Sequence, residues 1–194
     1  ELYKDEDRVM HISGSMYPIE PMKEETLFLR IPLCWGWATW DRAWRHFYKS
    51  NDVMGKFDRK MRRDFRFNDT YHSWKQLEEN KSEKINTWFI YWYAAMFLRG
   101  GLALFPGRPL VQNIGMDGTG VHSGTSNSYD VKPTASAIPV VRIPIRESVE
   151  AVIRHENYFR REYPPIPPLH IRVFRKILRV SGIRNETADG AAKK

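Results

Sequence analysis

Residues 115–124 hold the densest set of groups that could bind an anion or a metal ion. This segment has four glycines and two hydroxyl residues around Asp117 and His122. Closely spaced glycines let backbone N–H groups approach an anion such as phosphate. The histidine could donate to that phosphate or bind a metal ion, and a plain flexible loop is the alternative. The spacing matches neither a P-loop nor a dinucleotide-binding fingerprint, so the pattern indicates anion binding only in general terms.

Residues 34–44 could bind a flat or ring-shaped ligand. Four of the seven tryptophans fall within ten positions: Trp35, Trp37, Trp40 and Trp44. Trp35 and Trp37 alternate around Gly36, as in an extended segment, and their indole faces beside backbone donors suit such a ligand. Trp40 and Trp44 have helical spacing, which predicts a helix over residues 40–48 with both indoles in the core. The alternative is that all four indoles are buried.

Residues 56–80 combine basic and aromatic side chains. Phe57, Phe65 and Phe67 lie among six lysines and arginines between positions 56 and 66. Such interleaving can bind single-stranded nucleic acid through phosphate contacts and base stacking. The same aromatics at helical spacing can instead form the inner stripe of an amphipathic helix with a basic outer face, which is the interpretation we favour.

Composition limits the class of protein. With 194 residues, of which 42% are hydrophobic, the chain can fold as one globular unit with a sizeable core. The net charge of +8 favours acidic partners such as nucleotide phosphates, nucleic acid or an anionic membrane. Cys34 is the single cysteine, which excludes an internal disulfide framework and fits a reducing compartment. No apolar run reaches the ~18 residues that a membrane-spanning helix needs.

The hydrophobic pattern predicts strands and helices in alternation. We expect strands at residues 9–12, 27–31, 102–105 and 110–114, and an edge strand at 138–145 that contains Pro139 and Pro144. A largely buried helix is expected at 85–98 and a charged helix at 147–163. This order predicts an α/β fold with a mixed sheet and flanking helices.

The C-terminal part has a different composition. Prolines make residues 164–168 a stiff linker, and residues 169–181 form a predicted basic amphipathic helix. An apolar face with arginines and lysines beside it suits the surface of an anionic membrane. An arm that packs on the parent domain or on a partner subunit is the alternative. The polar tail from residue 185 is expected to be disordered.

Four ordered blocks of the sequence resemble the second half of family 2 glycosyltransferases with a GT-A fold. The blocks are residues 1–14, 35–40, 99–102 and 113–122. The resemblance covers roughly residues 1–125 and implies an incomplete GT-A-like mixed sheet. It also implies a nucleotide-sugar transferase whose acidic metal motif lies upstream of the strand at 9–12. Because the chain begins at Glu1, we expect it to be the acceptor-side piece of a longer protein and inactive alone.

The resemblance also implies roles for particular residues. His122 corresponds to a late histidine that completes the site of a divalent metal, Mn²⁺ or Mg²⁺, in many such enzymes. The implied substrate-binding residues are Trp35, Gly36, Trp37, Thr39, Trp88, Gly118 and Thr119. The general base of an inverting enzyme is expected at the start of the helix at 85–98, where this chain has no carboxylate. Glu83 and Asp117 are therefore the candidate bases.

Two functional hypotheses follow. The first is the acceptor-side part of an inverting, metal-dependent glycosyltransferase for cell-surface polysaccharide, with a nucleotide-sugar donor and a saccharide or lipid-linked acceptor. It would work in the cytoplasm at the inner face of the membrane, which it would contact through residues 169–181. No specific nucleic acid partner is expected. The oligomeric state is left open, with a homo-oligomer as one option. The second is a non-enzymatic basic module that binds anionic membrane or nucleic acid. The chain is expected to divide into three parts, which are residues 1–125, 126–163 and 164–194.

Overall fold

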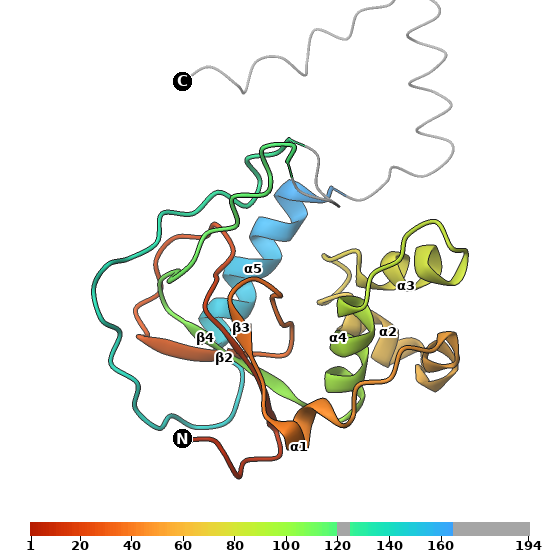
Figure 1. Cartoon of the computed structure of the whole chain (residues 1–194), viewed down its shortest axis with the longest axis horizontal. Coiled ribbons are helices and arrows are strands. Elements are labelled where there is room, and N and C mark those ends of the chain that lie inside the picture. The colour runs from red at the N-terminus through yellow and green to blue at the C-terminus, as the bar shows by residue number, and fades with distance from the viewer. Residues whose placement is uncertain (120–124, 165–194) are drawn as a thin grey trace, which may run out of the picture. The chain divides into compact units, whose positions relative to one another are not determined.

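The computed structural model describes residues 1–119 and 125–164 (Figure 1). Residues Glu1–Tyr163 form one compact unit, so the segment 126–163 belongs to the same unit as the preceding residues. The strands are β1 (Val9–Ser13), β2 (Thr26–Leu29), β3 (Trp37–Ala38) and β4 (Leu102–Pro106). The helices are α1 (Asp41–Trp44), the 3-10 helix η1 (Asn51–Lys56), α2 (Arg59–Phe65), α3 (Ser73–Lys81), α4 (Phe89–Leu98) and α5 (Val149–Glu162). His122 and the predicted helix at 169–181 lie outside the described residues.

The four strands form one mixed sheet in the order β2-β4-β1-β3. β1 runs parallel to β4, and the two outer strands, β2 and β3, pair antiparallel with their neighbours. The register places Ile12 opposite Leu104 in the parallel pair and Ile12 opposite Ala38 in the antiparallel pair. The predicted mixed α/β sheet with flanking helices is therefore confirmed.

Side chains alternate between two apolar layers, one on each face of the sheet. On β2, Leu27 and Leu29 belong to the larger core, whereas Phe28 belongs to the smaller one. The same alternation holds on β4, where Phe105 joins the larger core and Leu104 the smaller one. This is the period of two that a strand imposes on its side chains. Both faces are buried, which explains why the strand sequences are largely apolar.

Helices cover the face with the larger core. Trp92, Tyr93 and Met96 from α4 and Phe159 from α5 are all fully or almost fully buried in it. Figure 1 shows α2, α3 and α4 as one group and α5 as a separate helix beside the sheet. Ser148 caps α5, since its hydroxyl accepts a hydrogen bond from the backbone N–H of Ala151.

An irregular segment covers the other face, where the sequence predicts an edge strand at 138–145. That prediction is wrong, because these residues do not pair as a strand. The Tyr3 hydroxyl accepts a hydrogen bond from the backbone N–H of Ile143 at 2.8 Å, and Ile143 and Ile145 pack on the smaller core. Pro139 and Pro144 lack the N–H donors that a ladder requires, which gives the physical reason.

The predicted strand at 110–114 is also absent from the structure. The backbone N–H groups of Leu110 and Val111 both donate to the carbonyl oxygen of Gly14. A strand would send successive donors in alternating directions, so two donors on one acceptor mark a turn in the chain. Val111 instead packs against Gly36, where a Cβ atom would lie 2.6 Å from the Val111 side chain.

The basic and aromatic region folds as two helices, α2 and α3, and not as one. Asp58 caps α2, and Phe67, Asn68 and Asp69 then adopt positive φ angles that end it. Phe57, Phe65 and Phe67 are buried, whereas Arg59 and Arg63 are exposed. The predicted burial of the aromatics beneath a basic outer face is confirmed, but only Phe65 lies within α2, so the three rings do not form a stripe on one helix. Within the described residues, no helix is long and apolar enough to cross a membrane.

Candidate functional site

A cavity of about 750 Å³ lies where loops from the sheet meet α3 and α4. Tyr17 follows β1 and Met116 and Tyr129 follow β4, so segments from the carboxyl ends of both parallel strands contribute to it. Ligands of open α/β sheets commonly bind at this end of the strands. The lining residues are Tyr17, Leu33, Cys34, Trp35, Tyr71, Gln76, Ile85, Asn86, Thr87, Trp88, Phe89, Met116 and Tyr129.

Six of the thirteen residues that line the cavity carry aromatic rings. The rings of Trp35 and Tyr129 meet edge to face, with centroids 4.8 Å apart, and Tyr17 lies 6.1 Å from Tyr129. Trp88 is 37% exposed at the edge of the cavity and meets Phe89 edge to face. Such packing fixes the ring planes, because edge-to-face pairs are favoured geometries for aromatic side chains.

Neutral polar groups lie between the rings. The Gln76 amide donates to the Tyr71 hydroxyl at 3.5 Å, and the Asn86 side-chain carbonyl accepts from Lys49 at 2.5 Å. Burial raises the pKa of Tyr71 to about 12, and the neighbouring Tyr163 adds to this shift. Burial likewise raises the pKa of Cys34 to about 11. Both groups therefore stay protonated at neutral pH.

The lining residues include no aspartate, glutamate, histidine, lysine or arginine. Because the tyrosines and Cys34 are also neutral, the cavity carries no formal charge of its own. Hydroxyl groups that keep their proton both donate and accept hydrogen bonds. The arrangement is suited to binding an uncharged ligand that has an apolar face and several hydroxyl groups.

Two of the predicted substrate-binding residues, Trp35 and Trp88, line the cavity. Trp37, which was also predicted to bind substrate, contacts a different group of side chains. Its ring stacks on His11, with centroids 5.3 Å apart and an angle of 4° between the planes, and it also meets Trp44, Trp88 and Trp92. Trp37 thus belongs to an aromatic cluster beside the cavity and not to the cavity wall.

Gly36 and Thr39, also predicted to bind substrate, do not line the cavity and instead hold neighbouring segments together. Gly36 has a φ of +57°, and its carbonyl oxygen accepts from the backbone N–H of Gly14 at 2.6 Å. A side chain at Gly36 would be strained by this φ and would also clash with Val111. The Thr39 hydroxyl donates to the carbonyl oxygen of Met10 at 2.7 Å, which holds the residue against β1.

The predicted helix at 40–48 is reduced to the single turn of α1, and its tryptophans are not both in the core. Trp44 is 37% exposed, so the prediction that it is buried is wrong. Trp40 is partly buried against the smaller core. Ala43 is the buried residue of this turn, because α1 is too short to present a second apolar position to the interior.

The two candidate bases, Glu83 and Asp117, do not line the cavity, although each lies near a residue that does. Glu83 is exposed in the connection from α3 to α4, two positions before Ile85. Asp117 is exposed and follows Met116. The hydroxyl and then the backbone N–H of Thr119 hold the pKa of the Asp117 carboxyl below its usual range. This ties Thr119 to Asp117, and Gly118 between them has a φ of +94°.

A metal site is not formed by the residues that the structure describes. Within residues 1–119 and 125–164, no group of three or more histidine, cysteine, aspartate or glutamate side chains could hold a metal ion. Asp117, one of the two candidate bases, already accepts two hydrogen bonds from Thr119 through one oxygen. His122, the predicted metal ligand, lies outside the described residues.

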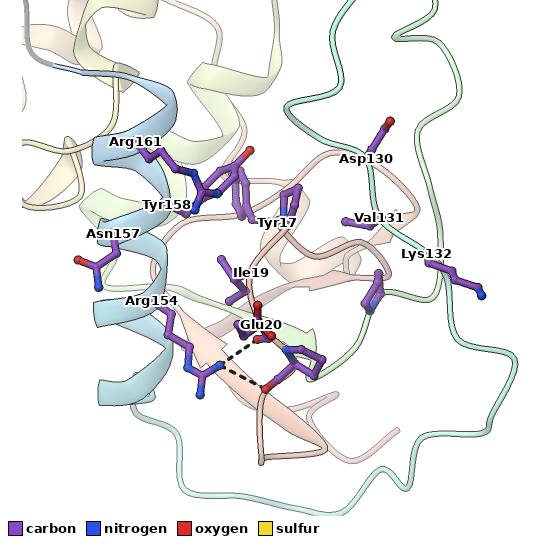
Figure 2. Close-up of a pocket in the computed structure, with 13 residues that line it drawn as sticks. Tyr17, Ile19, Glu20, Asp130, Val131, Lys132, Arg154, Asn157, Tyr158 and Arg161 are labelled. Carbon is purple, nitrogen blue, oxygen red and sulfur yellow. Dashed lines mark hydrogen bonds between the residues drawn. The ribbon is translucent and has the colours of Figure 1, made fainter. Parts of the chain in front are cut away.

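A second hollow, of about 880 Å³, lies on the other side of Tyr17 and is lined partly by α5 (Figure 2). Its lining carries charges of both signs, including Arg154 and Arg161 on α5. Arg154 donates to the carbonyl oxygens of Glu20 and Pro21, as the dashed lines in Figure 2 show, and Arg161 pairs with Glu162. Both guanidinium groups are therefore engaged within the protein. None of the predicted site residues that the structure describes lines this hollow.

Comparison of the chain with protein-family models, with curated proteins and with solved structures finds no match. The functional assignment therefore depends on the geometry of the aromatic cavity. Sequence reasoning missed Tyr17, Tyr71, Gln76 and Tyr129, which come from three separate segments of the chain. No spacing pattern connects them, since they meet only after the loops have packed together.

Proposed function

We propose that this chain provides the acceptor-binding part of a glycosyltransferase that uses a nucleotide-sugar donor. The observation that carries the proposal is the uncharged aromatic cavity that contains Trp35 and Trp88. A pyranose ring has an apolar face that can lie on an indole, and its hydroxyl groups can pair with neutral donors and acceptors. A nucleotide diphosphate would instead require positive groups or a metal ion, so the cavity suits the acceptor better than the donor.

The fold is compatible with this assignment. The mixed sheet, in which β1 and β4 are parallel and the outer strands antiparallel, supports a GT-A-like arrangement. In the proposal the donor and the divalent metal lie outside the aromatic cavity, and His122 keeps its predicted metal role. The described carboxylates do not fit a metal site, so no step is assigned to a metal here.

The cavity residues contribute binding and orientation, not proton transfer. Transfer to an acceptor hydroxyl requires a base that removes its proton. Asp117 is the better placed candidate, because it follows Met116 in the cavity wall and remains ionised at neutral pH. Its lowered pKa makes it a weak base, so it would act mainly by orienting the hydroxyl unless donor binding displaces Thr119.

Gln76→Ala is expected to weaken saccharide binding about three- to tenfold, the effect of losing one hydrogen bond with its partner left in place. Alanine maintains α3, because it is the best helix former. Binding should be measured by saturation-transfer NMR against a panel of neutral mono- and oligosaccharides of glucose, galactose and mannose. Lys75→Ala, on the exposed face of the same helix, is the matched control and should bind as the parent does.

Salt dependence separates a neutral ligand from an anionic one. Saccharide binding should be unchanged between low and high salt, whereas binding of a phosphate group would weaken steeply. A complete lack of saccharide binding, or binding of nucleotide diphosphates that shifts the indole signals of Trp35 and Trp88, would overturn the proposal.

A second candidate function is binding to an anionic membrane, favoured by a hollow of about 520 Å³ on the basic face of α2. Its lining is Arg59, Lys60, Arg63, Arg66 and Asp69. Lys60 pairs with Asp64 and Arg66 with Asp69, whereas Arg59 and Arg63 form no ion pair with any described residue. The aromatics between these cations, Phe57, Phe65 and Phe67, are buried, so they present no face on which nucleic acid bases could stack.

The double variant Arg59→Gln and Arg63→Gln should reduce binding to phosphatidylglycerol vesicles about tenfold or more, since each basic residue near such a surface contributes about 1 kcal/mol. Vesicle cosedimentation at physiological salt measures this. Lys75→Gln with Lys81→Gln on α3 removes the same charge elsewhere and is the control. An equal loss in both double variants would show a nonspecific effect of net charge.

A further inference from the structure

An exposed aromatic surface adjoins the cavity, and two of its three residues have no role in the site described so far. We name it the aromatic shelf and define it as Trp44, Phe47 and Trp88. Trp44 and Trp88 are each 37% exposed, although large apolar side chains usually lie inside. Trp44 and Phe47 stack with centroids 4.6 Å apart and planes within 8°, and Trp88 meets both edge to face.

The shelf is held in place by the rings of Trp92 and Trp37, which pack against it. Trp92 is fully buried and lies 5.2 Å from Trp44, and Trp37 lies 5.4 Å from Trp88. Trp92 donates its indole N–H to Nδ1 of His11 at 3.1 Å, and Nε2 of His11 donates to the carbonyl oxygen of Leu33 at 3.0 Å. These contacts fix the exposed indoles in one orientation, so the shelf needs little ordering to receive a ligand.

The shelf is continuous with the cavity. Trp88 belongs to both, since it lines the cavity and meets Trp44 and Phe47. Lys49, two residues after Phe47, provides a second link. Its ammonium group donates a hydrogen bond to the side chain of Asn86 in the cavity wall at 2.5 Å. A ligand that extends out of the cavity past Trp88 would therefore next meet Trp44.

We propose that the aromatic shelf is a second saccharide subsite and that the acceptor is an oligosaccharide of at least two residues. This inference rests on the proposed function of the cavity. One sugar residue occupies the cavity, and the next lies against the part of the Trp44 indole that Phe47 leaves exposed. The flanking polar groups, such as the exposed pair of Arg45 and Asp41, leave the neighbouring surface open to water, as the outer hydroxyl groups of a saccharide require.

A second copy of this chain is a less suitable occupant. The exposed parts of Trp44 and Trp88 amount to on the order of 200 Å² at most, taking a tryptophan as about 250 Å². A standard protein interface buries about 800 Å² on each partner. The shelf is thus the size of a contact with one or two sugar rings.

The test uses the full chain and compares saccharide ligands of different length. Isothermal titration with neutral glucose, galactose and mannose oligosaccharides of one to four residues should show Kd falling about tenfold from the monosaccharide to the di- or trisaccharide of the series that binds. Trp44→Ala should abolish that gain and leave the monosaccharide Kd unchanged. Tyr48→Ala is the control, because Tyr48 is 58% exposed on the same segment and lies outside the shelf.

Other outcomes overturn the inference in distinguishable ways. If Trp44→Ala has no effect, or weakens mono- and oligosaccharides by the same factor, the shelf is not a subsite but the cavity function stands. If no saccharide binds the parent chain, the cavity function fails and the subsite fails with it. If size-exclusion chromatography shows a dimer that Trp44→Ala dissociates, the shelf is a self-association surface. Where Trp44→Ala does not fold, Trp44→Leu keeps the apolar bulk and removes the flat face.

Discussion

Lowering the pH from 7 to 4 is expected to reduce the free energy of unfolding of this protein by about 6 kcal/mol through two buried histidines. Burial lowers the pKa of His11 and that of His155 from 6.5 to about 4. Each has a backbone hydrogen bond that offsets part of this shift. Domains of this size are stable by about 5–15 kcal/mol, so the loss is enough to unfold a marginal one.

The direction follows from proton binding in the two states. Above pH 6.5 both histidines are neutral in the folded and unfolded chains, and stability does not depend on them. Between pH 6.5 and 4 the unfolded chain binds a proton at each histidine and the folded chain does not, so stability falls with pH. A shift from 6.5 to about 4 corresponds to about 3 kcal/mol for each group at pH 4. Below pH 4 the folded histidines also bind protons and their contribution levels off.

His155→Leu tests this prediction more directly than a substitution at His11 would. Nδ1 of His155 donates to the carbonyl oxygen of Ala151 at 2.6 Å, but Nε2 has no partner among the described residues. The ring lies among Tyr17, Phe67, Phe105 and Phe159. An apolar replacement therefore removes the titration at a small cost in hydrogen bonds, whereas a change at His11 would break its bonds to both Trp92 and Leu33.

Urea unfolding at pH values from 7.5 to 4 measures the effect. In His155→Leu the loss of stability over this range should shrink by about 3 kcal/mol relative to the parent. His46→Gln, which removes a partly exposed histidine, should leave most of the loss in place. An unchanged pH dependence in His155→Leu would show that His155 does not cause the loss of stability and would overturn this prediction.

The sequence predicts the central elements of the fold well. β1, β2 and β4 are short, largely apolar runs that a glycine or proline follows within three residues, and such runs have few alternatives when both faces of a sheet are buried. The charged helix predicted at 147–163 appears as α5, with Ser148 as its cap. The buried helix predicted at 85–98 begins only at Phe89, and the preceding residues line the cavity instead.

Errors occur where tertiary contacts override a local pattern. Residues 110–114 have the composition of a strand, but both backbone donors at its start bond to Gly14. Trp37 alternates with Trp35 and was expected to face the same ligand, yet the two lie on different surfaces because Gly36 has a positive φ between them. The helical spacing of Trp44 predicts burial, but a helix of one turn cannot bury it.

The candidate site is predictable only in part for the same reason. Trp35 and Trp88 can be identified from the local sequence, and both line the cavity. Tyr17, Tyr71 and Tyr129 are more than fifty positions apart from one another and make the site neutral and rich in hydroxyl groups. Its lack of charge contrasts with the net charge of +8, which on its own favours an acidic ligand.

Gly107→Ala should destabilise the protein by about 3–5 kcal/mol, above the ~1–3 kcal/mol typical of overpacking, because the clash is with backbone. Gly107 is buried at the end of β4, where its N–H donates to the carbonyl oxygen of Glu25 and its carbonyl oxygen accepts from the N–H of Met22. A Cβ atom at Gly107 would lie 1.9 Å from the backbone oxygen of Glu24. Backbone cannot move aside as a flexible side chain can, so the clash would separate the two chain segments and disturb the pairing of Thr26 with Pro106.

Gly55→Ala is the matched control for this prediction, since no atom lies within 4 Å of a Cβ at that position. Thermal unfolding followed by circular dichroism should show a Tm lower by roughly 10 °C in Gly107→Ala and unchanged within a few degrees in Gly55→Ala, given about 2–4 °C for each kcal/mol in a domain of this size. A normal Tm in Gly107→Ala would mean that the turn between residues 22 and 25 can move away from β4. The antiparallel pairing of β2 with β4 would then not depend on this contact.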